Sequence, residues 1–206
     1  MLLIDAGRMM AAPASEATGM ARVDYAINAA LMLAHVAAHM GDTVGLLVFS
    51  DRVKTFVAPS RGAAQAERML EELYALQAEL VEPDFRGAIS FLRARARKRA
   101  MVCAFTDLVD PEVSAQALSY LSSLRPQHLP LVATVRDAEV QALADAGPSA
   151  ATDAYEKAIA SRTLGQREIA LARLRSRGVL VCDAAPGDLS AAVVNRYLSI
   201  KRRGLL

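Results

Sequence analysis

Apolar residues fall into short unbroken runs separated by longer segments in which apolar and polar residues mix. An unbroken apolar run of about four to eight residues is typical of a strand buried on both faces. Such strands are predicted at Met1–Ile4, Thr43–Phe49, Ala100–Phe105, His128–Val135 and Gly178–Cys182. The segment Val53–Val57 alternates between apolar and polar residues, which predicts an antiparallel edge strand instead.

The segments between these strands are predicted to be helical. The clearest is Arg22–Met40, which carries an apolar stripe through Ile27, Leu31 and Val36. The others are Ala63–Leu80, Phe85–Arg99, Pro111–Leu124, Asp137–Asp145, Thr152–Ser176 and Leu189–Arg203, while Asp5–Met20 is predicted as a loop. Strands that alternate with helices indicate an α/β fold. We expect a doubly wound, mostly parallel six-stranded sheet with strand order 3-2-1-4-5-6, an antiparallel edge hairpin and helices on both faces.

Acidic residues stand directly after several of the buried strands. Asp5, Asp107 and Asp183 each follow one, and Asp51 lies in the turn after the second. In an open α/β sheet, ligands bind beyond the carboxyl ends of the strands, where the strand order reverses. Asp5 and Asp107 are predicted to face each other across that point. An acid in such a turn can also simply accept hydrogen bonds from backbone N–H groups, and the residues alone leave both interpretations open.

Composition excludes some classes of protein. The 206 residues suffice for one domain with a sizeable core, and a net charge of +2 indicates no particular partner. Cys103 and Cys182 lie in apolar runs without C-x-x-C spacing, which predicts reduced core thiols in a cytosol-like compartment. The sequence contains no run of 18 or more apolar residues, so it predicts no membrane span. Because Met1 leads straight into a strand, we expect the native protein to begin upstream, with residues 1–206 forming one domain in its C-terminal part.

Other sequence features give little support for a zinc, nucleic-acid, hydrolase or nucleotide site. His35 and His39 have a spacing that can bind zinc, but no third ligand is at hand, and histidines near a helix C-terminus favour the helix dipole. The basic run Arg93–Arg99 has no interleaved aromatic residues, so a solvated helix end is favoured over a nucleic-acid site. Neither a G-x-S-x-G motif nor a phosphate-binding glycine loop is present.

Several longer stretches carry a resemblance to a known family. They are LLIDAGRMM, VDYAINAALMLAHVAAHMGD, GDTVGLLVFSDRV, VAPSRG and VCAFTDLVD. Together with the order of elements, they resemble a von Willebrand factor A domain, and more narrowly the one in the bacterial domain-of-unknown-function family 58. The resemblance implies a non-catalytic protein-interaction domain. It also implies that the domain acts with a MoxR-type AAA+ ATPase in protein maturation or stress handling. A membrane anchor upstream of residue 1 is implied as well, with this domain on the cytoplasmic side.

The resemblance also implies a metal-ion-dependent adhesion site, built from D-x-S-x-S, a threonine and a later aspartate. Asp5 and Asp107 match the two aspartates, whereas Gly7 stands at the first serine position and Met9 at the second. Asp84 falls near the threonine position. Mg²⁺ prefers oxygen ligands, so we expect a degenerate site. It holds either no metal or weakly bound Mg²⁺ or Mn²⁺ on Asp5, Asp84 and Asp107, with Arg8 or a neighbouring base neutralising the acids.

Two functions follow from these residues. In the first, Asp5, Gly7, Arg8, Asp84 and Asp107 form the contact face for a protein partner, and Asp107→Ala weakens binding without unfolding the domain. The alternative is a Mg-dependent hydrolase or phosphatase-like enzyme that uses Asp5 and Asp107. Phosphatases of the haloacid dehalogenase type, however, need a second aspartate where Gly7 stands, and a lysine that no strand end supplies.

Overall fold

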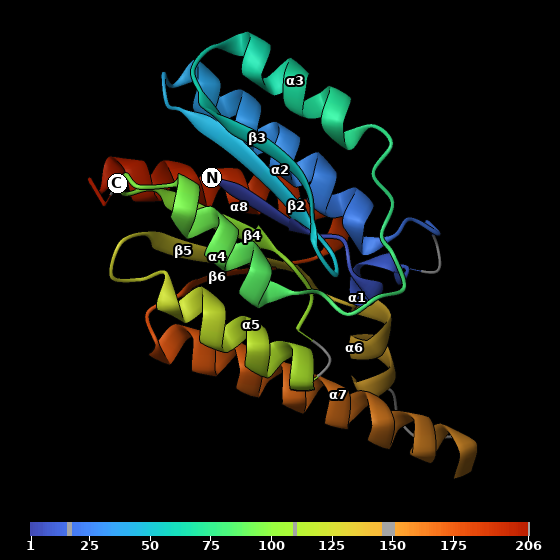
Figure 1. Ribbon diagram of the computed structural model, residues 1–206. Helices are drawn as coiled ribbons and strands as arrows, with labels where there is room; N and C mark the ends of the chain where they lie inside the picture. Colours follow the sequence, from blue (N-terminus) through green and yellow to red (C-terminus); the bar gives the residue numbers. More distant parts are fainter. Residues whose placement is uncertain (16–17, 109–110, 146–150, 206) are drawn as a thin grey trace.

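A computed structural model describes residues 1–15, 18–108, 111–145 and 151–205. In this part of the chain one six-stranded sheet has the order β3-β2-β1-β4-β5-β6 (Figure 1). Only β3 runs antiparallel to its neighbour, β2. The predicted strand order and edge hairpin are therefore confirmed. The strands are β1 (Leu2–Asp5), β2 (Val44–Phe49), β3 (Val53–Ser60), β4 (Met101–Phe105), β5 (Leu129–Val135) and β6 (Leu180–Ala184).

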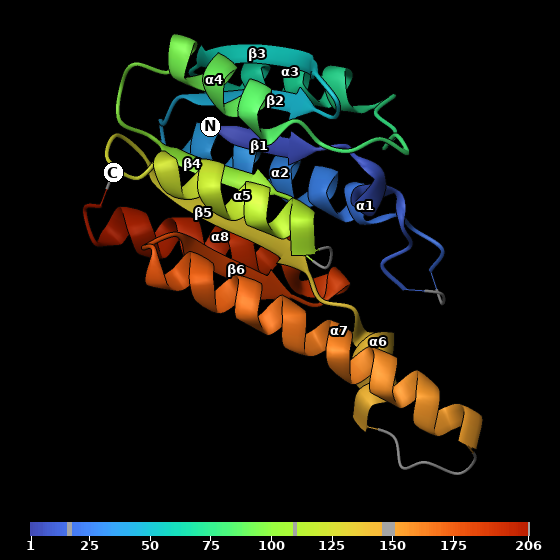
Figure 2. The same ribbon diagram turned by 60° about the horizontal axis from the view of Figure 1, so that its bottom comes forward.

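Helices cover both faces of this sheet, as Figures 1 and 2 show. One face packs against α2 (Arg22–His39), α3 (Ala63–Leu73) and α8 (Leu189–Arg202), and the other against α4 (Phe85–Arg95), α5 (Pro111–Ser123) and α7 (Ala151–Ser176). The short helices are α1 (Arg8–Ala11), α6 (Ala138–Asp145) and a 3₁₀ turn, η1 (Pro186–Asp188). Together, α6 and the first half of α7 project beyond the sheet (Figure 2).

Side chains of the central strand enter two separate cores. Leu2 and Ile4 pack into the core beneath α2 and α8, whereas Leu3 packs into the core beneath α4, α5 and α7. All three side chains are buried. Because successive strand residues point to opposite faces, both faces of β1 have to be apolar, and its run is unbroken for that reason. The strand thus holds its terminal Asp5 at a fixed place at the edge of the sheet.

Four predicted boundaries were wrong by more than two residues, and one of them is the end of β3, predicted at Val57 and observed at Ser60. The predicted loop Asp5–Met20 contains the short helix α1, and the predicted helix Ala63–Leu80 ends at Leu73. Beyond Leu73 the backbone bonds to other elements instead of to its own helix: the N–H of Glu79 donates to the carbonyl of Ala6. Helix α4 ends at Arg95, so the end of the basic run lies in the connection to β4.

Within residues 1–15, 18–108, 111–145 and 151–205, no helix combines the length and the apolar character needed to cross a membrane.

Candidate functional site

Asp5 ends β1 and lies almost wholly beneath the surface, with 1% of its area exposed. Its Oδ1 accepts a hydrogen bond from the Gly7 N–H at 2.8 Å, and its Oδ2 accepts one from the Thr106 hydroxyl at 2.6 Å. Burial raises the pKa of Asp5 to about 6, because it penalises the charged form more than the two hydrogen bonds favour it. The carboxyl group is thus tied into the ends of β1 and β4.

The segment Glu79–Asp84 lies across the carboxyl end of β1. The Arg8 N–H donates to the Val81 carbonyl at 2.9 Å, and the Asp84 N–H donates to the Ser50 carbonyl at 2.7 Å. A Cβ atom added to Gly7 would lie 3.0 Å from Asp5 Oδ1, from Pro83 Cδ and from the Val81 carbonyl oxygen. A serine at position 7 would therefore be tightly packed, and its neighbours would have to shift by a few tenths of an ångström to accommodate it.

Asp107 follows β4 and is bound by two arginine side chains. Arg167 Nη1 donates to its Oδ1 at 2.7 Å, and the guanidinium of Arg22 forms an ion pair with its Oδ2. The Leu108 N–H also donates to Oδ1, at 2.7 Å. Arg22 Nη2 makes a second ion pair, with Asp137 Oδ2 at 2.8 Å. Asp107, Arg22 and Arg167 are all buried. Two positive charges thus face a carboxylate that has almost no contact with solvent.

Arg167 joins this group to the ends of the neighbouring strands. Its Nη2 donates to Thr134 Oγ1 at 2.9 Å, to the Val135 carbonyl at 2.8 Å and to Asp183 Oδ1 at 2.9 Å. Such charge-assisted bonds to a planar guanidinium are both strong and directional. We call Arg22, Arg167, Asp107, Asp137 and Asp183 the arginine network. It connects the beginning of α2 and the middle of α7 to the carboxyl ends of β4, β5 and β6.

The predicted site residues therefore have separate roles. Asp5 and Asp107 end adjacent strands as predicted, but Asp5 bonds to Thr106, whereas Asp107 bonds to the arginines. Asp84 is the N-cap of α4, and its Oδ1 accepts from the Gly87 N–H at 2.9 Å. Arg8 forms a surface ion pair with Glu82, with 2.5 Å between Nε and Oε1. The bases facing Asp107 are thus Arg22 and Arg167 rather than Arg8.

This donor set does not fit a divalent cation. Two guanidinium groups beside Asp107 repel a further positive charge, and both oxygens of Asp5 already accept hydrogen bonds. Gly7 offers no side-chain oxygen. In the described part of the chain, no group of three His, Cys, Asp or Glu side chains could hold a metal ion.

Sequence reasoning missed Arg22 and Arg167 as site residues. Arg22 is the first residue of α2, where a positive charge interacts unfavourably with the helix dipole. An arginine at that position could have indicated an acidic partner elsewhere in the fold. Arg167 lies 60 residues beyond Asp107, among many charged residues of α7, and no local pattern marks it.

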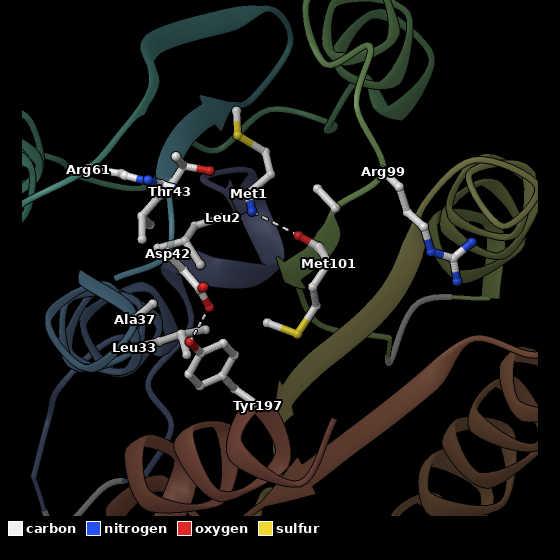
Figure 3. Close-up of a pocket in the computed structure, with 12 residues that line it drawn as sticks. Met1, Leu2, Leu33, Ala37, Asp42, Thr43, Arg61, Arg99, Met101 and Tyr197 are labelled. Carbon is white, nitrogen blue, oxygen red and sulfur yellow. Dashed lines mark hydrogen bonds between the residues drawn. The ribbon is translucent and has the colours of Figure 1, made fainter. Parts of the chain in front are cut away.

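A cavity of about 220 Å³ lies at the opposite, amino-terminal edge of the sheet (Figure 3). Tyr197 of α8 points toward Asp42, and its hydroxyl donates to Asp42 Oδ2 at 2.5 Å. Lys201 Nζ donates to the other oxygen, Oδ1, at 2.8 Å. Burial, followed by the hydrogen bond to Asp42, raises the pKa of Tyr197. These bonds fasten α8 to the turn that precedes β2.

Comparisons with known proteins agree with this geometry. The crystal structure of the SpRpn10 VWA domain resembles the chain with a TM-score of 0.55 and 12% sequence identity, over 93% of this chain and 91% of that one. At this identity the likeness shows the fold alone. No match was found among curated proteins. A family model described as "Protein of unknown function DUF58" matches residues 1–172. Because that match spans most of the chain, the protein belongs to the DUF58 family, and its fold is that of a von Willebrand factor A-like domain.

Proposed function

We propose that this domain is a non-catalytic protein-interaction module that works without a metal ion at the carboxyl edge of its sheet. One observation carries the proposal: Asp107, which would complete a metal site or take part in catalysis, is already neutralised inside the protein by Arg22 and Arg167. The fold supports it, because von Willebrand factor A-like domains commonly mediate protein interactions.

The contacts of the buried acids weigh against the hydrolase or phosphatase alternative. A nucleophile or general base must come within hydrogen-bond reach of the substrate. Asp5 and Asp107 are each only 1% exposed, and both already accept hydrogen bonds from the protein. The thiols of Cys103 and Cys182 are no substitute, because both are buried and burial raises the pKa of each.

The surface above these acids supplies the proposed contact face. Its exposed members come from three segments that lie together: the start of α1, the Glu79–Asp84 segment and the β2–β3 turn. We call Arg8, Glu82, Asp51 and Arg52 the charged rim. Exposed ion pairs such as Arg8–Glu82 and Arg52–Asp51 contribute little to stability, so a partner can exchange them for its own charges. Asp5 and Gly7 lie beneath this rim and are buried, and Asp107 is buried at the end of the neighbouring strand.

The proposed partner is a MoxR-type AAA+ ATPase, in maturation or stress handling of other proteins on the cytoplasmic side. The support is the family resemblance of stretches such as GDTVGLLVFSDRV, together with membership of the DUF58 family. The charged rim offers both signs of charge, which favours recognition by complementary charges over burial of a large apolar patch.

A binding measurement tests this proposal. The affinity of the domain for a purified MoxR-type ATPase is measured by biolayer interferometry for the wild type, Arg8→Glu and Arg52→Glu. The matched control is Arg68→Glu, at an exposed position on α3. We expect rim variants to bind about ten-fold or more weakly, since a like charge replaces a complementary one. Equal affinities for the rim variants and the control contradict the contact face, and no binding by the wild type contradicts the partner.

A further inference from the structure

A groove of about 950 Å³ lies at the amino-terminal edge of the sheet, away from the charged rim. It is bordered by the residues that begin β5 and β6, by the connection before β4, and by the ends of α5 and α7. Figure 2 shows these strand and helix ends on the side where the C-terminus is marked. The described residues that line it include Arg99, Arg125, Arg175 and Arg196, and none of them is acidic.

The four arginines come from separate elements of the fold. Arg99 precedes β4, Arg125 follows α5, Arg175 lies in the last turn of α7 and Arg196 lies within α8. Among the described residues, no carboxylate lies within ion-pair distance of any of them. Four like charges around one hollow repel one another, and an anion bound between them would offset that repulsion.

Favourable interactions with helix dipoles explain the positions of only two of these four arginines. Arg125 and Arg175 lie near helix C-termini, where a positive charge is favourable whether or not a ligand binds. Arg196 lies midway along α8 and Arg99 lies outside any helix, so that explanation does not cover them. The Nε of Arg196 is buried and has no hydrogen-bond partner in the described part of the chain.

His128 is an independent sign of a ligand in the groove. It lines the groove with only 1% of its area exposed, and both of its ring nitrogens lack a hydrogen-bond partner among the described residues. The hydroxyl of Ser122, another lining residue, is unpartnered in the same way. Buried polar groups without partners are costly and uncommon. Burial, the positive charge of the N-terminal ammonium group and the charges of Arg93 and Arg99 lower the pKa of His128.

Glycine at position 178 makes room for one of the arginines. Gly178 has φ +76°, and a Cβ atom built there would collide with the guanidinium group of Arg125. The guanidinium therefore lies against the backbone that leads from α7 into β6, at the wall of the groove. Any other residue would be strained at this φ and would also displace the arginine.

We propose that this groove binds a small organic molecule that carries a di- or triphosphate group. Guanidinium groups bind phosphate oxygens through paired hydrogen bonds, and four positive charges match a polyphosphate better than a single carboxylate. The groove is within the usual size range of sites for organic ligands and exceeds the needs of one phosphate ion. Pro126, Val181 and Leu205 supply an apolar wall for the organic part.

Calorimetric titration of the chain at physiological salt tests this proposal, with ADP, ATP, pyrophosphate and inorganic phosphate as probes. The variants are Arg125→Gln and Arg196→Gln, and the matched control is Arg68→Gln on α3. We expect saturable binding of ADP or ATP that weakens about ten-fold or more in each groove variant and is unchanged in the control. Tighter binding of ADP than of pyrophosphate indicates that the apolar wall contributes.

Four results would overturn the proposal. Three are no binding of any probe, equal affinities for the groove variants and the control, and binding of inorganic phosphate as tight as that of ADP. The fourth is binding of a single-stranded oligonucleotide without binding of ADP, which would assign the groove to nucleic acid. Circular dichroism of each variant verifies folding. Should Arg196→Gln not fold, Arg125→Gln still decides the question, because Arg125 is exposed.

Discussion

Arg167 and Asp107 lie 60 residues apart in the sequence and form a buried ion pair of 2.7 Å at the carboxyl edge of the sheet. With Arg22 on its other oxygen, the carboxylate of Asp107 has two positive partners supplied by the chain itself. The arginine network therefore places two positive charges beside this buried carboxylate at the edge of the sheet.

Asp107→Ala is expected to lower the free energy of unfolding by about 3–5 kcal/mol, because it leaves two buried guanidinium groups without their shared partner. This replaces the sequence-based expectation that the variant stays folded and loses only partner binding. Urea unfolding followed by circular dichroism measures the change, with the exposed Asp51→Ala as control. A loss below about 1 kcal/mol in Asp107→Ala would show that the network contributes little to stability.

Gly7→Ser is expected to destabilise the domain by about 1–3 kcal/mol without creating a metal site. The new side chain must push aside Pro83 and the Val81 carbonyl, while the arginines beside Asp107 remain. Thermal unfolding with and without MgCl₂ measures both effects, since a bound ion raises Tm. Gly187→Ser, at a glycine with open space around it, is the control. A Tm that rises with Mg²⁺ in Gly7→Ser would contradict the prediction.

The wild type is likewise expected to give no saturable heat when Mg²⁺ or Mn²⁺ is titrated into it. Both oxygens of Asp5 accept hydrogen bonds, and those of Asp107 face guanidinium groups. The double variant Asp5→Ala, Asp107→Ala serves as the reference for heats of dilution. Saturable binding that this variant abolishes would establish a rearranged metal site and would remove the basis for metal-free recognition.

The stability of the domain is expected to depend on the protonation of Asp5. Its pKa is raised to about 6 in the folded state, so folding favours the protonated form and stability falls as the pH rises from about 4 to about 6. The wild type should lose about 2 kcal/mol relative to Asp5→Asn over that range, out of about 3 kcal/mol for the complete titration, since each pKa unit corresponds to about 1.4 kcal/mol. Urea unfolding of both proteins at several pH values measures this difference. A difference that does not change with pH would mean that burial does not control the titration of Asp5.

Tyr197→Phe is expected to cost about 1–3 kcal/mol, because it removes a hydrogen bond to the carboxylate of Asp42. Thermal unfolding measures the loss, and Tyr155→Phe, at an exposed position on α7, is the matched control. Equal Tm values for the two variants would show that the bond between α8 and the turn before β2 does not stabilise the fold.

The sequence predicted the sheet better than it predicted the site. Unbroken apolar runs are sufficient to locate strands such as β1, because burial on both faces leaves no other pattern. The end of α3 at Leu73 could not be predicted in this way, since it depends on a hydrogen bond between Glu79 and Ala6 that crosses the fold. Arg167 was missed for the same physical reason: its partners come from β4, β5 and β6 and are brought together only by folding.

The positive charges that face Asp107 belong to side chains of the same polypeptide, and this has a biological consequence. An ion that is free in solution occupies its site in proportion to its concentration, so chelators and changes in cellular magnesium alter any surface that depends on it. The guanidinium groups of Arg22 and Arg167 belong to the polypeptide and cannot dissociate from it. The positive charge beside Asp107 is therefore set when the protein folds, and the proposed metal-free recognition would not depend on the concentration of free Mg²⁺.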